Sequence, residues 1–255
     1  LGRRAGGGRM NTLIIARAEL RRIFLSPLAW AVLAVVQVLL GFIFVNVLFD
    51  FINQPGFGGG FGASDVVVGQ VFGFATILVL LIMPLMTMRL FAEERKSGTL
   101  NLLLSAPVSL TEIVLGKFLG VLGFIVVLLA VTALMPLALL PTTDLDVGRV
   151  AAGLLGLLLL MGSFAAAGLF VSSLTREPTI AAVASFGLLL LIWLVNILGY
   201  QDGVPFAEVI RYLSLIEHYE SLRRGVFNTA DIAYYALFTA LFLGLTVQRL
   251  DLERQ

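Results

Sequence analysis

Few side chains in this sequence could do chemistry, and they gather in two short segments. Glu93, Glu94 and Arg95 stand together in a charged stretch, and His218 follows Glu217 in another. Neighbouring carboxylates can act as acid and base, and a histidine can act as a general base near neutral pH. Either activity needs further side chains at defined places, so the rest of the chain decides whether these residues form a catalytic site.

Those further side chains are missing. The chain has no cysteine and one histidine, which excludes thiol chemistry and a site built from several histidines. Membrane proteases with paired glutamates need an arginine where this chain has Gly98, and no nucleophile-elbow pattern lies near His218. Gly116-Lys117 lacks the leading glycine and the following Ser or Thr of a phosphate-binding loop. We therefore predict no enzyme activity, no ATP hydrolysis by this chain alone, and no cofactor or metal of its own.

The composition places the chain in a membrane. Hydrophobic residues make up 59% of it and charged residues 13%, and 255 residues cannot bury so much apolar surface in a soluble domain. About 20 apolar residues in a helix span a bilayer core. We predict an all-α integral membrane protein with one six-span domain over residues 10–255, while residues 1–9 read as an upstream or vector-derived segment. The six predicted spans are 28–49, 66–88, 118–140, 150–174, 180–198 and 232–247.

The basic residues predict the orientation of the spans. If the amino terminus lies inside, then of the 17 lysines and arginines only Arg149, Arg211, Arg223 and Arg224 fall outside. Cytoplasmic segments of membrane proteins carry the excess of basic residues. We therefore expect both termini in the cytoplasm. The net charge of +1 does not point to nucleic acid, and we expect no nucleic-acid partner.

Residues 10–24 have helical periodicity ahead of the first span. Apolar side chains recur at helical spacing from Leu13 to Phe24, while Arg17 and Arg21 share another face. This pattern predicts an amphipathic helix at the inner membrane surface. It fits a basic membrane anchor and a partner-binding helix equally well.

The charged stretch 89–100 is followed by signals for a short cytoplasmic helix. Gly98 ends the extension of the second span, residues 99–104 supply apolar turns, and Pro107 stops them. Ser109-Leu-Thr-Glu112 is a capping-box pattern that precedes the third span. A helix held at both ends can transmit a push from a partner. The charges of residues 93–96 also fit ordinary solvated charge at a span end, but the Gly-Thr-Leu and Ser-Ala-Pro that follow favour a docking helix.

A second segment of mixed character lies between the fifth and sixth spans. Pro205 can begin a short helix, Ser214-Leu-Ile-Glu217 is a capping-box pattern for another, and Gly225 can stop it. We expect a short outer helical hairpin. It either dips into the outer leaflet against protein or lies on the membrane surface, and both readings stay open.

The loop after the second span resembles that of a known family, the permease subunits of ABC-2 type ABC transporters. That loop typically reads Glu-Glu-Arg-x-x-Gly-Thr, an acidic residue two positions beyond the threonine, and Leu-Leu-Ser-x-Pro. This chain has Glu93-Glu94-Arg95-Lys96-Ser97-Gly98-Thr99 and then Leu103-Leu104-Ser105-Ala106-Pro107, with Asn101 in the place of the acid. The resemblance covers the chain from Met10, and residues 213–228 are similar to permeases of the gliding-motility type.

The resemblance implies a half-transporter in a bacterial or archaeal plasma (inner) membrane. It implies a second permease, as a copy or a paralogue, and ABC ATP-binding subunits that hold ATP and magnesium and dock on residues 99–104 and on the amphipathic helix. Closure of those subunits would rock the spans and move substrate between the two permeases. The coupling residues it implies are Glu93, Glu94, Arg95, Gly98, Thr99, Leu100 and Leu103.

We therefore predict the permease of an ATP-driven transporter, working as an exporter. No acid or base lies deep in a span, which argues against ion coupling and favours a lipid-like or hydrophobic substrate. In this reading His218, Glu217 and Gly225 form an outer gate, with His218 held partly protonated by Glu217 and Glu220. An interfacial helix pair with a solvated histidine is the other reading of that segment. For the whole chain, the alternative is a membrane anchor or assembly scaffold that translocates nothing.

Overall fold

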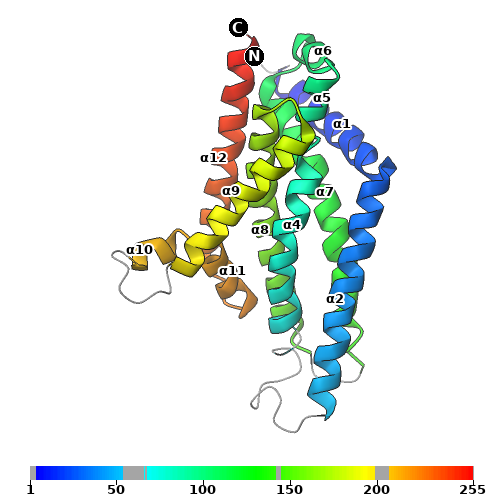
Figure 1. Cartoon of the computed structure of the whole chain (residues 1–255), viewed down its shortest axis with the longest axis vertical. Helices are drawn as coiled ribbons and strands as arrows, with labels where there is room; N and C mark the ends of the chain where they lie inside the picture. Colours follow the sequence, from blue (N-terminus) through cyan, green and yellow to red (C-terminus); the bar gives the residue numbers. More distant parts are fainter. Residues whose placement is uncertain (1–3, 54–65, 67, 142–144, 199–206, 255) are drawn as a thin grey trace.

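The computed structural model of the chain describes residues 4–53, 66, 68–141, 145–198 and 207–254. Within these residues the secondary structure is helical, and six helices are long and apolar enough to cross a membrane (Figure 1). The predicted six-span, all-α fold is confirmed. The elements are α1 (Arg4–Leu25), α2 (Pro27–Asn53), η1 (Val68–Phe72), α4 (Gly73–Thr87), α5 (Ala92–Lys96), α6 (Leu100–Ser105), α7 (Leu110–Leu137), α8 (Val147–Leu174), α9 (Pro178–Leu198), α10 (Ala207–Tyr212), α11 (Leu215–Arg223) and α12 (Thr229–Arg254).

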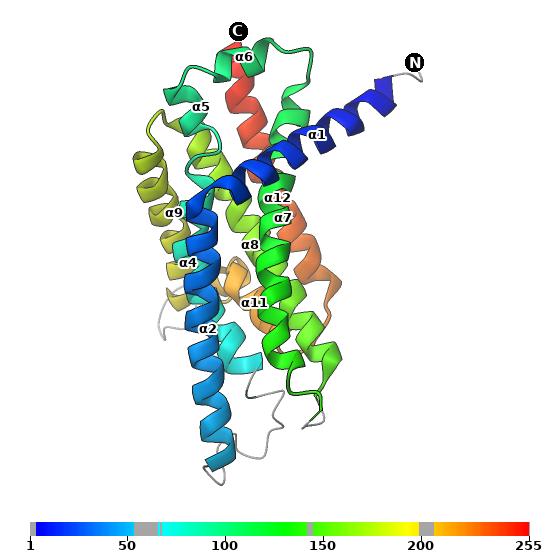
Figure 2. The ribbon, with the colours of Figure 1, turned by 90° about the vertical axis from the view of Figure 1, so that its right-hand side faces the viewer.

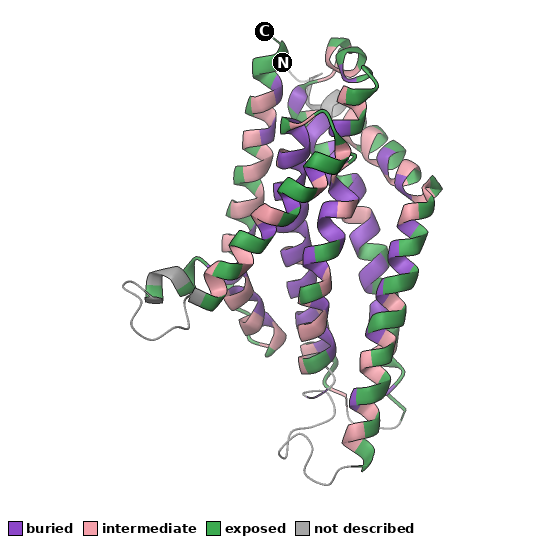
Figure 3. Cartoon of the chain, viewed as in Figure 1, coloured by how far each residue is buried: buried purple, intermediate pink, exposed green. Residues whose placement is uncertain are grey.

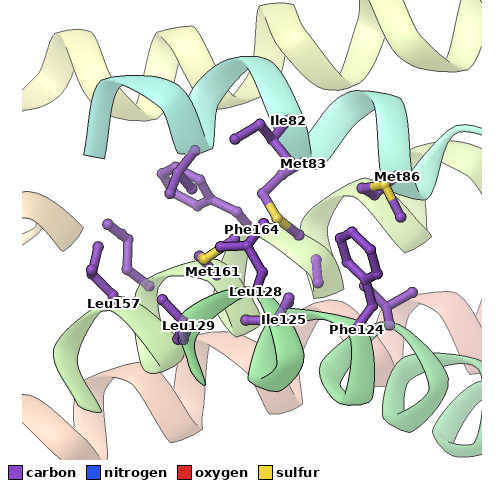
Figure 4. Close-up of a cluster of buried hydrophobic side chains, with 14 of the residues drawn as sticks. Ile82, Met83, Met86, Phe124, Ile125, Leu128, Leu129, Leu157, Met161 and Phe164 are labelled. Carbon is purple, nitrogen blue, oxygen red and sulfur yellow. The ribbon is translucent and has the colours of Figure 1, made fainter. Parts of the chain in front are cut away.

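The centre of the bundle is α8. In the most apolar stretch of α8, 72% of the residues are buried, whereas in the most apolar stretch of α9 the buried share is 17% (Figure 3). Small residues of α8 let its neighbours approach closely, because a Cβ at Gly168 would lie 2.2 Å from the Thr87 hydroxyl of α4. Between α4, α7 and α8 the core is filled by interlocked apolar side chains, among them Met83, Phe124 and Phe164 (Figure 4).

A groove of small residues on α7 holds α1, which crosses the bundle near one of its ends (Figure 2). A Cβ at Gly116 would lie 2.6 Å from Ile15, and one at Gly120 would lie 2.8 Å from Glu19. Glycines one turn apart let two helix backbones come close together. Leu13 of α1 remains 64% exposed, which suits an interfacial helix that rests on protein along one face and meets lipid along another.

The third span begins earlier than the apolar stretch 118–140 predicts. Its helix starts at Leu110, because Ser109 and Glu112 form the expected capping box, with Ser109 Oγ accepting from the Glu112 amide at 3.2 Å. The helix then runs through Lys117, which is buried. Sequence patterning treats a lysine as the end of a span, whereas here carboxylates from two other helices surround it.

Both ends of the bundle have a glycine in the left-handed region. Gly98 has a φ of 73° between α5 and α6, and Gly225 has a φ of 83° after α11. A side chain is disfavoured in this conformation, so each glycine ends a helix and lets the chain reverse. The end of α12 lies at the same end of the bundle as α1, α5 and α6 (Figure 1).

Candidate functional site

A short helix is present where one was expected after the second span, as α6 at the tip of the bundle (Figure 1). Leu100 is 5% exposed and packs into the protein, whereas Leu102 is 72% exposed. Thr99 is also exposed and Leu103 is half-buried. The helix is therefore anchored along one face and presents an apolar side chain on another. Leu102 was not among the predicted coupling residues, because the run of leucines does not reveal which one points outward.

Glu93 and Glu94 at the start of α5 form ion pairs with the interfacial helix. Arg22 of α1 donates to Glu93 at 3.0 Å and to Glu94 at 3.4 Å. Glu94 also accepts from Lys117 of α7 at 2.6 Å, and Lys117 contacts Glu19 of α1 at 3.3 Å. These five side chains, which we call the inner ion cluster, join α1, α5 and α7.

Lys117 is the centre of the inner ion cluster. Its side chain is 2% exposed, and its ammonium group lies 5.2 Å from the centre of the Phe91 ring. A buried ammonium group is tolerated only when carboxylates and hydrogen bonds replace water around it. The side chain of Glu94 is 17% exposed, so the reading of this residue as a solvated charge is wrong. Glu93, at 48%, remains largely in solvent.

The other two charges of α5 bind further elements at the same end of the bundle. Arg95 pairs with Glu253 of α12 at 2.7 Å, and Arg249 reinforces Glu253 at 3.0 Å. Lys96 pairs with Glu177, in the turn between α8 and α9, at 2.8 Å. All four charged residues of α5 are thus bound to parts of the chain far away in sequence. Through these ion pairs, a displacement of α5 would act on α1, α7, α9 and α12 together.

A cleft of about 380 Å³ lies beside the joint between α5 and α6. Its lining includes Gly98, Leu100 and Asn101 together with Arg95 and Arg176. Asn101 occupies the place where the family resemblance expects an acid, so that position adds no negative charge to the arginines of the cleft. The acid among the lining residues is Glu253, which is paired with Arg95.

His218 in the outer hairpin is buried, but its partners differ from those expected. Its Nδ1 lies 2.7 Å from Asp231 of α12, its Nε2 lies 2.9 Å from the carbonyl of Tyr212, and its ring stacks on Tyr234. A carbonyl accepts a hydrogen bond, so Nε2 is the donor to Tyr212, and Nδ1 faces the Asp231 carboxyl. The expectation that Glu217 and Glu220 hold His218 is therefore wrong.

The two glutamates instead bind arginines. Glu217 pairs with Arg211 at 3.9 Å, and Glu220 is bound by Arg223 and by Arg224. Burial alone would raise the pKa of Glu220, but the hydrogen bond and charge of Arg223, together with the charge of Arg224, outweigh burial and lower this pKa below its usual range. Glu220 is therefore ionised near neutral pH.

The hairpin of α10 and α11 packs against the transmembrane bundle. Tyr219 of α11 donates to the Phe72 carbonyl at 3.3 Å, and Arg223 donates to the Gly69 carbonyl, both at the start of the second span. A Cβ at Gly156 of α8 would lie 2.9 Å from the Tyr219 ring. Since α8 begins at Val147, this contact lies about 14 Å along its axis at 1.5 Å per residue. The predicted capping serine is confirmed by its contact with the Glu217 amide, and Pro205 lies outside the described residues.

Residues 13–249 match the family model of the ABC-2 family transporter protein. The match covers nearly the whole chain, and the chain belongs to this family. It is a multi-pass membrane protein and a permease of an ABC transporter, a transport subunit that associates with an ABC ATP-binding subunit. A search of curated proteins gives no match.

Sequence reasoning missed the partners that give the site its geometry. Arg22 and Lys117 make three of the five ion pairs that join α5 to other described elements, Glu19 pairs with Lys117, and Asp231 binds His218. Two signals in the sequence could have pointed to Lys117 and Glu19. One is a lysine directly before a long apolar stretch, and the other is an acid inside a basic amphipathic helix. Nothing in the local sequence connects Asp231 to His218, because the pairing depends on how α11 folds back on α12.

Proposed function

We propose that this chain is the permease half of an ATP-driven exporter, which works as a dimer with ABC ATP-binding subunits docked on α6. Glu93, Glu94, Arg95, Gly98, Thr99, Leu100 and Leu103 form the coupling site, to which we add Leu102. The observation that carries the proposal is the binding of every charged side chain of α5 to another element. The resemblance of residues 213–228 supports placing the chain with gliding-motility-type permeases.

The proposed coupling runs from α6 through α5 into the spans. A partner that pushes on Leu102 would move α6, which is joined to α5 through Gly98. Movement of α5 would then pull α1 and α7 through the inner ion cluster, and α12 through Arg95. Packed helix interfaces have only a few discrete arrangements, so a small local shift can switch the whole bundle from one arrangement to another.

The polar side chains of the spans favour a substrate pathway that lies outside the six-helix bundle of one chain. Gln37 donates to Thr132 at 3.0 Å, and Ser163 and Thr239 lie 3.2 Å apart, so these groups join helices within one chain. They are engaged as interhelical contacts, as single polar side chains of membrane helices commonly are. We infer that substrate passes between two permeases and is lipid-like or hydrophobic, with α10 and α11 closing the outer end.

The outer hairpin fits the dipping reading better than the surface-lying reading. Tyr219 and Leu222 are fully buried against α8, and Arg223 binds the start of the second span. Movement of α8 or η1 would therefore move α11. We propose that His218, Glu217 and Gly225 act as parts of this outer gate, with His218 joining it to α12 through Asp231.

The test is purification from native membranes with and without the partner. The lone chain in lipid nanodiscs is expected to hydrolyse no ATP, whereas the chain isolated under mild conditions carries an ATPase whose activity drives loss of a hydrophobic dye from proteoliposomes. Turnover by the lone chain would refute the assignment as a transport subunit without an ATPase site. An associated ATPase without any transport of lipid-like probes would favour the anchor or scaffold function.

A further inference from the structure

A groove of about 590 Å³ lies where α1, α2 and α4 meet. Its lining combines apolar side chains with three arginines, two from α1 and one from the end of the second span. The groove is not used by the proposed coupling path, although it borders the inner ion cluster. The lining side chains used below are Leu25, Leu28, Leu85, Arg21, Arg22 and Arg89.

Two of the three arginines are available to an anion. Arg22 is bound by Glu93 and Glu94. Arg21 and Arg89 are exposed, and in the ranges that the structure covers neither guanidinium group has an ion pair or a hydrogen bond. The groove therefore presents two cations without a counter-charge.

The acids of the groove do not cancel these two cations. Glu19 and Glu93 also line it. Glu19, Glu93 and Glu94 share the two cations Arg22 and Lys117, so the inner ion cluster carries one surplus negative charge, and Arg21 and Arg89 bring the total to +1. The uncompensated charge in the groove is positive.

The position of the groove fits the level of lipid headgroups. The helix α1 ends at Leu25 and the long apolar helix α2 begins at Pro27, and the two helices meet at a corner (Figure 2). Residues of both helices line the groove, so it lies at this corner. Trp30 is 60% exposed there and donates to the Phe24 carbonyl at 2.8 Å. Tryptophan is enriched at this level of a bilayer, where an apolar ring can keep a polar contact.

We propose that this groove binds an anionic phospholipid of the cytoplasmic leaflet. Arg21 and Arg89 contact the phosphate, and the first acyl carbons lie against Leu25, Leu28 and Leu85. Arginine suits this role because its planar guanidinium group can give two parallel hydrogen bonds to phosphate oxygens. A bound lipid would connect α1 to α4 beside the Arg22 and Glu93 ion pair.

The test compares lipid binding to wild type and to charge variants in detergent by native mass spectrometry. Short-chain phosphatidylglycerol is expected to bind, and phosphatidylcholine is expected to bind more weakly. R21Q/R89Q is expected to weaken phosphatidylglycerol binding about 30-fold, since each basic residue near an anionic membrane surface contributes roughly a factor of five. R21K/R89K keeps the charge and is expected to retain most of the binding.

The matched control is R17Q, because Arg17 is an exposed arginine one turn earlier on α1 and does not line the groove. It is expected to bind phosphatidylglycerol like wild type. Equal loss in R17Q and R21Q/R89Q would overturn the proposal, as would equal binding of the two lipids by wild type. If inorganic phosphate displaces the lipid at equal concentration, the groove binds a free anion, and this result would also overturn the proposal.

Discussion

The two glutamates of α5 share Arg22 but are not equivalent. Glu94 also neutralises the buried Lys117, whereas Glu93 has no ion pair besides that with Arg22 among the described residues and is 48% exposed. Removing one partner of a buried ion leaves that ion poorly compensated, while an exposed pair contributes little. The Glu-Glu sequence could be predicted as important, but only the fold distinguishes a structural glutamate from an accessible one.

The first prediction compares Glu94→Gln with Glu93→Gln. Glu94→Gln is expected to lower the free energy of unfolding by about 2 kcal/mol, because Lys117 loses a charged hydrogen-bond acceptor. Glu93→Gln is expected to lower it by less than about 1 kcal/mol. Thermal unfolding of both variants in the same detergent gives the comparison, and equal effects would contradict the central place of Lys117 in the inner ion cluster.

At the scale of elements, helix existence could be predicted and helix packing could not. Six apolar stretches, the capping box at Ser109 and the stop at Gly225 follow from local sequence. The position of α1 follows from Gly116 and Gly120, whose missing side chains make room for Ile15 and Glu19. Their role depends on which helix comes to lie against them, so local pattern alone does not reveal it.

The second prediction tests the turn that ends α11. Gly225→Ala is expected to destabilise the protein by about 1 kcal/mol, because its φ of 83° is disfavoured for a residue with a Cβ. The added methyl group would meet only Arg149 at 3.6 Å, so the cost is conformational. Gly244→Ala in α12 is the control and is expected to stabilise by about 0.5 kcal/mol, since it lies in a helix with open space around it. Opposite signs in thermal unfolding support the assignment, and a neutral Gly225→Ala would refute it.

At the scale of the whole molecule, the ion pairs of α5 lie at one end of the bundle, and the hairpin of α10 and α11 lies toward the other. The inner ion cluster, the Arg95 and Glu253 pair, and α6 share the end where α12 finishes (Figure 1). In the proposed coupling, a force on α6 would pass through α5 to α8, since the Ala92 amide of α5 donates to Ser172 of α8 at 3.2 Å, and then to α11, since Tyr219 and Leu222 pack against Gly156 of α8. The distribution of arginines and lysines predicts the membrane orientation.

The third prediction concerns that orientation. The chain has no cysteine, so single thiols can be introduced without background. Ser97→Cys and Thr229→Cys occupy exposed positions near α6 and at the start of α12. In intact cells a membrane-impermeant maleimide is expected to label Thr229→Cys and to reach Ser97→Cys only after lysis. The reverse pattern would invert the proposed topology.

The most direct test of the coupling surface is site-specific photo-crosslinking at Leu102 in native membranes. Leu102 is 72% exposed on α6, and the control position Leu237 is 71% exposed on α12. A photoreactive residue at Leu102 is expected to form an adduct with the ABC ATP-binding subunit, and one at Leu237 is expected to form none. Absence of that adduct from Leu102, in membranes where the two subunits still co-purify, would contradict the assignment of α6 as the docking helix.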